Sequence, residues 1–448
     1  MKNKRLLTGI VLSGIVLILV LVCGLLLSKR SGNRSDQNAP DTVADLVIPP
    51  YEAPAVDAEH GDMPDRTDED EQQPVENQIM EPEEEDVKEK DSGAEKKRAW
   101  IEEKLDTMTI EEKVCQLFML SPEKLTGVSQ VVAAGDVTKN AIQNYPVGGI
   151  IYFGPNIETP QQIAQMISNT QGYAMDRSGL PLFIAVDEEG GYVTRIAKNS
   201  NFDVPTFPYA SEIGQSGNVS DAREMGDAIG AYLESYGFNV DFAPVADVLS
   251  NAENQVVKKR SFGSDPQLVS DMVLAELDGL EQHRMIGCVK HFPGHGATVG
   301  DTHEGYAYTE KTWEELLECE AIPFADSIKH GVSMVMVGHI SLPNVVGDHT
   351  PASMSHRMIT EHLREELGYD GIVITDSLGM GAITNSYSSR QVAVSVLKAG
   401  GDILLDPADF KSAYEGILAA INDGELTEAR IDESVSRILS VKYELMEE

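Results

Sequence analysis

The chain has 448 residues, a 42% share of hydrophobic residues and a formal net charge of −38. This charge argues against nucleic acid or an anionic membrane surface as a partner, because a phosphate-rich partner needs compensating Lys and Arg side chains. The four cysteines show no metal-site spacing and are too few to act as a disulfide framework in a chain of this size. We therefore expect a neutral partner and no cofactor.

An apolar run without charged residues covers residues 6–27 and follows three basic residues. A helix needs ~20 apolar residues to cross a bilayer. The run is longer than the apolar part of a typical cleaved signal peptide, and no small-x-small site follows it. Cys23 suggests lipidation as an alternative, although Val22 before it is larger than that processing usually tolerates. We predict that residues 1–30 form an uncleaved single-pass membrane anchor, with the rest of the chain outside the cell.

Residues 31–98 are rich in Pro, Glu, Asp and Gln and contain few aromatic residues. Such a stretch cannot bury enough apolar surface to offset its chain entropy, and its like charges repel one another. We expect a disordered acidic linker here, which tethers a folded domain that covers residues 99–448.

Short apolar runs alternate with longer helical segments in this domain. The eight expected strands are Val114–Leu120, Val147–Phe153, Pro181–Asp187, Asn239–Asp247, Ile286–Phe292, Ser333–Ile340, Gly371–Asp376 and Asp402–Leu405. Helical periodicity is clearest in Asp221–Tyr236, Asp265–His283, Thr312–Lys329, Ser355–Leu367 and Thr427–Leu445. This pattern predicts an α/β fold, a single (β/α)8 barrel of the TIM type, with a doubly wound open sheet as the alternative.

Charged residues and histidines fall where the expected strands end. The segments are VDEEGG (186–191), FAPVADV (242–248), KHFPGHG (290–296), VGHI (337–340), ITDSLGM (374–380) and LLDP (404–407). In a barrel, the carboxyl ends of the strands converge on one face, where active sites are built. We therefore expect these side chains to gather at one site.

The segment KHFPGHGATVGDTHEG (290–305) contains three histidines. His291 and His295 have the i, i+4 spacing of helical zinc ligands, but a Pro-Gly pair between them prevents a regular helix. A zinc site is therefore a poor interpretation. Asp301 and His303 lie two residues apart, so in an extended segment they point to the same side and can pair.

Asp376 directly follows an apolar strand, so its carboxylate must face a cavity or a partner. Together with a pair formed by Asp301 and His303, it offers a nucleophile and a general acid/base. Retaining cleavage of a glycosidic bond requires these two roles, although the general scheme uses two carboxylates ~5 Å apart. Here an imidazole would replace one of them.

The stretches DEEGGYVTR, FAPVADV, RSFGSDP, KHFPGHG followed by DTH, and TDSLGM resemble glycoside hydrolase family 3 in order and approximate spacing. The His-rich loop resembles the β-N-acetylglucosaminidase (β-hexosaminidase) branch of that family. The resemblance covers nearly all of residues 99–448. It implies a carbohydrate substrate and exo-cleavage of terminal β-linked N-acetylglucosamine, commonly from peptidoglycan fragments, through a covalent glycosyl-enzyme.

The resemblance also implies roles for individual residues. It makes Asp376 the nucleophile, His303 the acid/base and Asp301 the partner of His303. The implied sugar-binding residues are Asp187, Arg195, Arg260, Lys290 and His291.

The chain departs from the family pattern at two places. Tyr192 stands where Arg is frequent, and Lys258-Lys259 stand where a Gly is usual. These positions could alter recognition of the aglycone, so the sequence does not determine the natural substrate. A β-glucosidase, a glycosidic-bond phosphorylase of the same family and a non-catalytic cell-wall sugar sensor stay as alternatives.

Overall fold

The computed structural model describes residues 84–301 and 307–447, which belong to a compact unit that covers Met80–Glu448. The predicted anchor lies outside the described residues, and so does His303. In the described ranges, no helix is long and apolar enough to span a bilayer. Helix α2 (Glu84–Thr107) begins inside the segment predicted as a disordered linker. Its last part is held by the domain, because Lys97 Nζ lies 2.5 Å from a Glu444 carboxylate oxygen.

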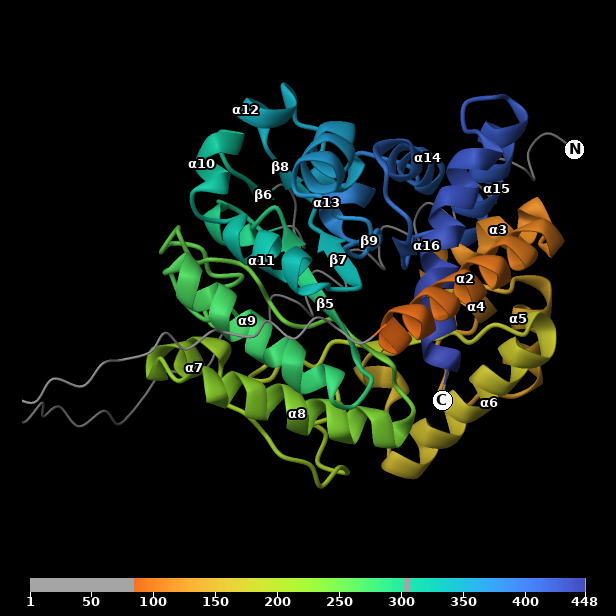
Figure 1. Ribbon diagram of the computed structural model, residues 1–448, viewed down its shortest axis with the longest axis horizontal. Coiled ribbons are helices and arrows are strands. Elements are labelled where there is room, and N and C mark those ends of the chain that lie inside the picture. The colour runs from red at the N-terminus through yellow and green to blue at the C-terminus, as the bar shows by residue number, and fades with distance from the viewer. Residues whose placement is uncertain (1–83, 302–306, 448) are drawn as a thin grey trace, which may run out of the picture. The chain divides into compact units, whose positions relative to one another are not determined.

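Eight parallel strands form one sheet in the order β10-β1-β2-β3-β4-β5-β7-β9. Three of them, β5, β7 and β9, are labelled in Figure 1. A parallel bridge between Ile374 and Ile403 links the two ends of this order, so the sheet is nearly closed into a barrel, in agreement with the predicted fold. A separate two-stranded sheet pairs β6 with β8. The strands are β1 (Phe118–Leu120), β2 (Gly149–Ile151), β3 (Phe183–Val186), β4 (Val240–Asp241), β5 (Ile286–Phe292), β6 (Ala307–Tyr308), β7 (Met334–Val337), β8 (Ile340–Ser341), β9 (Ile372–Thr375) and β10 (Leu404–Leu405).

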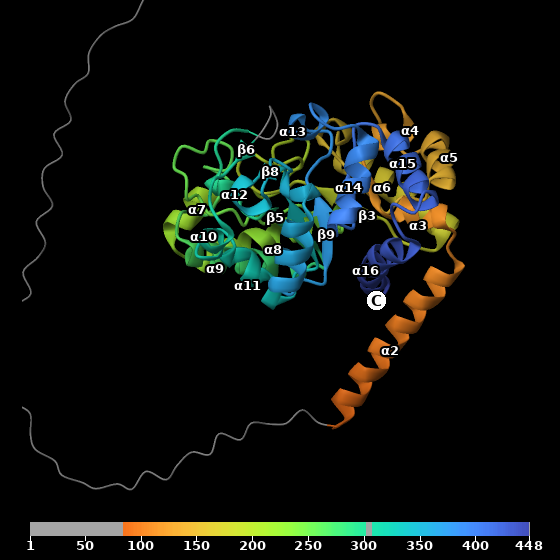
Figure 2. The same ribbon diagram turned by 90° about the horizontal axis from the view of Figure 1, so that it is seen from above.

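Helices connect the strands and cover the outside of the sheet (Figures 1 and 2). The strands are buried along nearly their whole length, which explains their continuous apolar sequences. Burial of each Val, Ile or Leu side chain stabilises the folded state by roughly 1.5–3 kcal/mol relative to leaving it exposed. The remaining helices are α3 (Ile110–Gln116), α4 (Pro122–Thr126), α5 (Asp136–Asn144), α6 (Pro160–Ser178), α7 (Ala210–Ser216), α8 (Val219–Tyr236), α9 (Pro266–Glu281), α10 (Trp313–Leu317), α11 (Ile322–His330), α12 (Pro343–Val346), α13 (Gly381–Thr384), α14 (Ser389–Ala399), α15 (Phe410–Asn422) and α16 (Glu428–Met446), with the short turns η1 (Gly154–Asn156), η2 (His295–Ala297) and η3 (Ala352–Met354) and the π-type helix η4 (Arg357–Glu366).

Several predicted elements differ from the observed ones. The expected strand 239–247 is observed only as β4 (Val240–Asp241). The first half of the expected strand 114–120 belongs to helix α3, because Thr109 and Glu112 form a capping box that starts a helix there. The expected helix 312–329 is divided into α10 and α11, and the second of them begins with Pro323 in its first turn.

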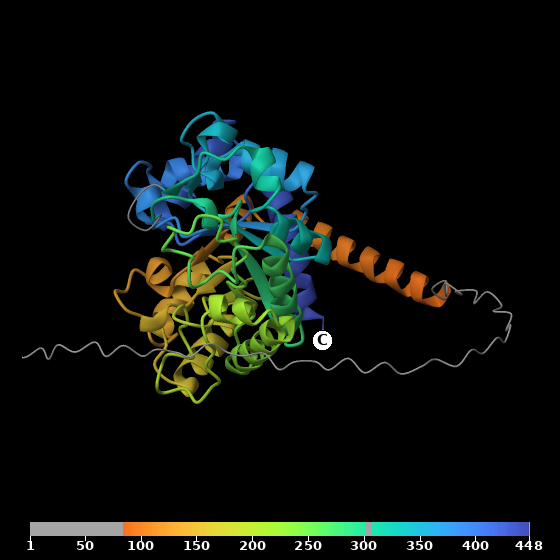
Figure 3. The ribbon, with the colours of Figure 1, turned by 90° about the vertical axis from the view of Figure 1, so that its left-hand side faces the viewer.

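Helix α16 contacts the barrel near the amino-terminal ends of β1 and β3. Its Lys442 Nζ donates a hydrogen bond of 2.8 Å to Gln116 Oε1, just before β1, and lies 5.2 Å from the centre of the Phe183 ring at the start of β3. The rings of Tyr443 and Trp100 pack edge to face at 5.3 Å and join α16 to α2, the long orange helix of Figure 3. The strand ends that carry the predicted site therefore lie at the opposite, open end.

Candidate active site

A cavity of about 610 Å³ lies at the carboxyl ends of the strands. Its wall contains every predicted site residue that the structure describes, namely Asp187, Arg195, Arg260, Lys290, His291, Asp301 and Asp376. Glu189 and Tyr192 line it as well. The convergence expected from the strand ends is therefore confirmed for the described residues, while the roles of the individual side chains stay predictions.

Alternation of side chains along the segment that follows β3 explains which acids of the DEEGG segment face the cavity. Asp187 and Glu189 are two residues apart and both line the cavity, whereas Glu188 between them points the other way and is fully buried. The Glu188 carboxylate accepts hydrogen bonds from the backbone N–H groups of residues 195, 196 and 197, at 2.5, 2.9 and 2.8 Å. The Tyr232 hydroxyl adds a fourth at 3.0 Å. Glu188 thus holds the loop that carries Arg195.

A chain of ion pairs crosses one wall of the cavity. Lys290 Nζ lies 3.1 Å from Asp187 Oδ1 and 2.6 Å from Glu189 Oε1. Arg195 reaches the other oxygen of Asp187 at 3.1 Å, and Arg260 binds Glu189 through two hydrogen bonds. Burial alone would raise the pKa of Glu189, but Arg260 and Lys290 outweigh it and hold that pKa well below its usual range. The wall therefore carries three cations that share two carboxylates, and its charged groups are paired within the protein.

Sequence reasoning missed Glu189 and Asp247. Asp247 is fully buried, and its Oδ2 lies 2.8 Å from His291 Nδ1. Its Oδ1 accepts the backbone N–H groups of His291 and His295 at 3.1 and 2.6 Å. Both acids lie in segments identified as strand ends, and the alternation of side chains along an extended segment could have singled out Glu189. No sequence signal indicates the partner of Asp247.

Asp376 follows β9 and is partly buried at the cavity wall. Its backbone N–H donates to the Val337 carbonyl at 3.0 Å, and its Oδ1 accepts the Ser377 N–H at 2.7 Å. Burial would raise the pKa of Asp376, but the electrostatic influence of His291 and His339 and the Ser377 N–H lower it. The carboxylate is therefore ionised at neutral pH, as a nucleophile requires.

The root of the loop that leads to Asp301 is fixed by packing and hydrogen bonds. Gly294 adopts a φ of 128°, and a Cβ atom there would lie 2.6 Å from Glu320 Cβ. Asn254 Nδ2 donates to the His295 carbonyl at 2.8 Å and to the Thr298 carbonyl at 3.2 Å. Asp301 is thereby brought to the cavity, while its predicted pairing with His303 lies outside the described residues.

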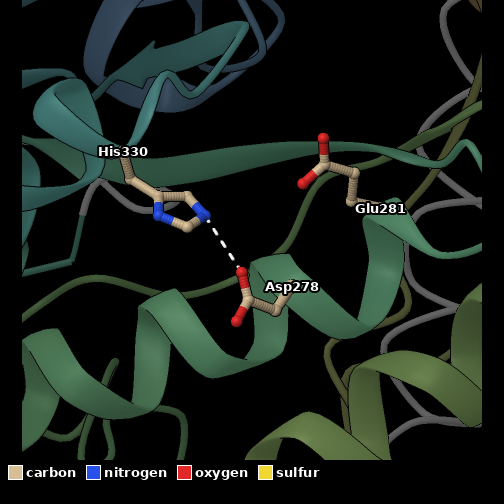
Figure 4. A group of neighbouring side chains, drawn as sticks. All are labelled: Asp278, Glu281 and His330. Carbon is tan, nitrogen blue, oxygen red and sulfur yellow. Dashed lines mark ion pairs between the residues drawn. The ribbon is translucent and has the colours of Figure 1, made fainter. Parts of the chain in front are cut away.

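Asp278, Glu281 and His330 form a group away from this cavity whose possible ligand atoms lie close together (Figure 4). His330 Nε2 lies 3.1 Å from Asp278 Oδ1, and Arg223 Nη1 lies 3.2 Å from the other oxygen of Asp278. Both oxygens of Asp278 thus already have a partner nitrogen, one from His330 and one from Arg223. We interpret the group as a surface ion-pair cluster between α8, α9 and α11.

The family model for the glycosyl hydrolase family 3 N-terminal domain matches residues 109–441. This chain belongs to glycosyl hydrolase family 3. The predicted family, and with it the prediction that the chain is a glycosidase, is confirmed.

Relatives of this family 3 chain include beta-hexosaminidase A of Pseudoalteromonas piscicida, 35% identical over 68% of this chain and 54% of that protein. Beta-hexosaminidase LpqI of Mycobacterium tuberculosis is 32% identical over 72% of this chain and 83% of that protein. A family 3 beta-N-acetylglucosaminidase structure from Paenibacillus sp. str. FPU-7 matches with a TM-score of 0.71 and 36% identity, over 75% of this chain and 62% of that one. The chain thus spans about half of the first relative.

The rim of the family 3 cavity carries an unusual aromatic residue. Tyr192 is 46% exposed, and its hydroxyl donates to the Val256 carbonyl at 3.4 Å. Its ring contacts that of Tyr209 at 5.8 Å, and Lys259 Nζ lies 4.3 Å from the centre of the Tyr209 ring. The two departures from the family pattern therefore lie in one patch, of which Tyr192 reaches the cavity.

Proposed function

We propose that this chain is a retaining exo-glycosidase that removes terminal β-linked N-acetylglucosamine residues, with peptidoglycan fragments as the natural substrate. The observation that carries the proposal is a cavity in which an ionised Asp376 shares the wall with the charged side chains Asp187, Lys290, Glu189 and Arg260. Such groups suit a neutral, hydroxyl-rich ligand, since sugar hydroxyls both donate and accept hydrogen bonds. The names of the relatives, beta-hexosaminidase and beta-N-acetylglucosaminidase, support the choice of sugar.

In the proposed reaction, an Asp376 oxygen attacks the anomeric carbon while His303 transfers a proton to the departing glycosidic oxygen. A bond forms between Asp376 and the sugar, and the bond to the aglycone breaks. His303, now neutral, then takes a proton from a water molecule, whose oxygen displaces Asp376 and releases the sugar. Asp301 would stabilise the charged imidazole before the first step and after the second.

We propose in addition that residues 1–30 anchor the protein in the cell membrane and that the catalytic domain lies outside the cell. The uncharged apolar run of residues 6–27 supports the anchor, and the long acidic stretch behind it supports the orientation. Protease treatment of intact cells tests this directly, because an external domain is released from the cells and a cytoplasmic one is protected.

The catalytic proposal is tested with a panel of chromogenic aryl β-glycosides. We expect turnover of the N-acetylglucosaminide by the wild type. In Asp376→Asn we expect kcat to fall by roughly 1,000-fold or more, as for a group essential to the chemical step, and thermal unfolding to stay unchanged. A slow fluorinated N-acetylglucosaminide is expected to leave its mass on the peptide that contains Asp376. Label on another peptide would reassign the nucleophile, and absence of turnover with every glycoside would favour the sugar sensor.

The same panel separates the alternatives within the family. Preferred turnover of the glucoside would indicate a β-glucosidase. Reactions with added inorganic phosphate reveal a phosphorylase, because a sugar phosphate then accumulates in place of the free sugar. For the proposed hydrolase, phosphate leaves both the rate and the product unchanged.

A further inference from the structure

The segment that follows β4 runs beside β5 and brings a fully buried carboxylate next to the site. Val245 forms a parallel bridge with Lys290, and the Ala246 N–H donates to the Lys290 carbonyl at 2.7 Å. Asp247 comes next and is 0% exposed. Its two oxygens accept hydrogen bonds from protein groups alone, which are the ring of His291 and the backbone of His291 and His295. Among the described residues, Asp247 is not one of those that line the cavity.

The hydrogen bond to Asp247 decides which ring nitrogen of His291 carries the proton. Burial would raise the pKa of Asp247, but His291 outweighs it and lowers that pKa, so the carboxylate is ionised. An ionised carboxylate can only accept, so the nitrogen 2.8 Å away, Nδ1, must be the donor. His291 Nε2 then stays available as an acceptor, and it lies 3.5 Å from Arg260 Nη2 at the cavity wall.

The same carboxylate also sets the start of the loop toward Asp301. Its Oδ1 accepts the N–H of His295, the first residue of η2, at 2.6 Å. That turn is in turn held by Asn254, through the carbonyls of His295 and Thr298. One buried group therefore determines both a ring orientation in the sugar site and the path of the loop.

We propose that Asp247 is a positioning residue, which fixes the Nδ1–H tautomer of His291 and the origin of the loop that carries Asp301. It acts through these groups and does not touch the sugar. The kinetic part of the inference rests on the proposed glycosidase function, whereas the tautomer of His291 is independent of it.

A matched control exists near the same strand. Asp241, the last residue of β4, is also 0% exposed, and its Oδ1 accepts the Glu188 N–H at 3.0 Å. Burial raises the pKa of Asp241 well above its usual range, which favours the neutral acid. Asn is nearly equivalent to a neutral Asp. Asp241→Asn is therefore expected to leave the site intact, while Asp247→Asn removes a charge.

In Asp247→Asn, the amide oxygen can still accept the two backbone N–H groups, but the amide nitrogen would face His291 Nδ1 as a donor. This reverses the tautomer of the ring. We expect kcat to fall ~100-fold, the order expected for a misplaced site group, with a small change in the melting temperature. Asp241→Asn should stay within a few-fold of wild type.

The tautomer itself is read from nitrogen-15 spectra of histidine-labelled full-length protein, at a pH high enough to leave the ring neutral. The His291 signal is assigned by its loss in His291→Gln. We expect the proton on Nδ1 in the wild type and on Nε2 in Asp247→Asn. A wild-type ring protonated on Nε2 overturns the inference, even if the variant fails to fold.

The activity assay and the nitrogen-15 spectra together show which of the two proposals fails. An inactive wild type whose His291 carries its proton on Nδ1 contradicts the glycosidase function and supports the positioning. An active wild type with a folded Asp247→Asn variant of full activity contradicts the positioning alone.

Discussion

The Arg260 guanidinium donates two hydrogen bonds to the Glu189 carboxylate, 2.7 Å from Nε and 2.6 Å from Nη2. Because Lys290 binds the same carboxylate, Glu189→Gln would leave two buried cations without their shared anion. Loss of one partner of a buried pair costs about 3–5 kcal/mol. We expect the free energy of unfolding of the variant, measured by urea denaturation, to be lower by that amount. We also expect its kcat/KM to fall.

The pH dependence of this effect has a definite sign. The pKa of Glu189 is lowered in the folded protein from an ordinary value of 4.5, so its stabilisation is present above pH 4.5 and is lost as the pH falls below it. The difference between wild type and Glu189→Gln should therefore shrink in acid. Glu212→Gln, at an exposed position, serves as control, and an equal midpoint for all three proteins at pH 7 would contradict the prediction.

We expect the stability of the protein to rise with pH because Lys442 is buried. Burial lowers its pKa from 10.5 to about 7. Between these values the unfolded chain binds more protons than the folded one, so the free energy of unfolding should increase from pH 7 to pH 9. Lys442→Met should reduce this slope and raise the stability at pH 7. Urea unfolding at both pH values tests it, with the exposed Lys411→Met as control. Identical slopes in wild type and Lys442→Met would refute the prediction.

Tyr192 is expected to contribute to binding of the aglycone. An exposed ring at the cavity rim offers an apolar face to a second sugar. Tyr192→Ala should raise KM for a disaccharide substrate roughly 3- to 10-fold, which corresponds to about 0.7–1.4 kcal/mol, and leave KM for a small aryl glycoside unchanged. Met175→Ala, also at an exposed apolar side chain, is the control. An equal effect on both substrates would assign Tyr192 to the sugar site instead.

Glu188 is expected to affect substrate affinity through the loop of residues 195–197. Glu188→Gln replaces one accepting oxygen by an NH2 group, and each unsatisfied buried N–H costs about 1–3 kcal/mol. We expect a higher KM with a smaller change in kcat, and faster proteolysis within the loop. Glu276→Gln is the matched control, because burial together with the charge of Glu189 raises the pKa of Glu276 to about 8, so it is already neutral at pH 7. Unchanged KM and proteolysis in Glu188→Gln would contradict this assignment.

The sequence predicts the barrel well because its strands are buried on both faces and appear as isolated apolar runs. It fails at residues 114–116, where the Thr109 cap favours a helix over a strand. In the site, Asp187, Lys290 and Asp376 are predictable as polar residues at strand ends. Asp247 is not, since its partner His291 is 44 residues away in the chain and only the paired strands bring them together.

The ion pairs along the cavity wall join protein side chains to one another. The long side chains of Arg260 and Lys290 each carry about 2 kcal/mol of rotational entropy when free, and this freedom is already lost when the chain folds. A sugar therefore meets a rigid array of charges and has few side chains to immobilise. Selectivity at this wall should accordingly depend on the shape and hydroxyl pattern of the ligand, and binding should show only a small conformational contribution to its entropy.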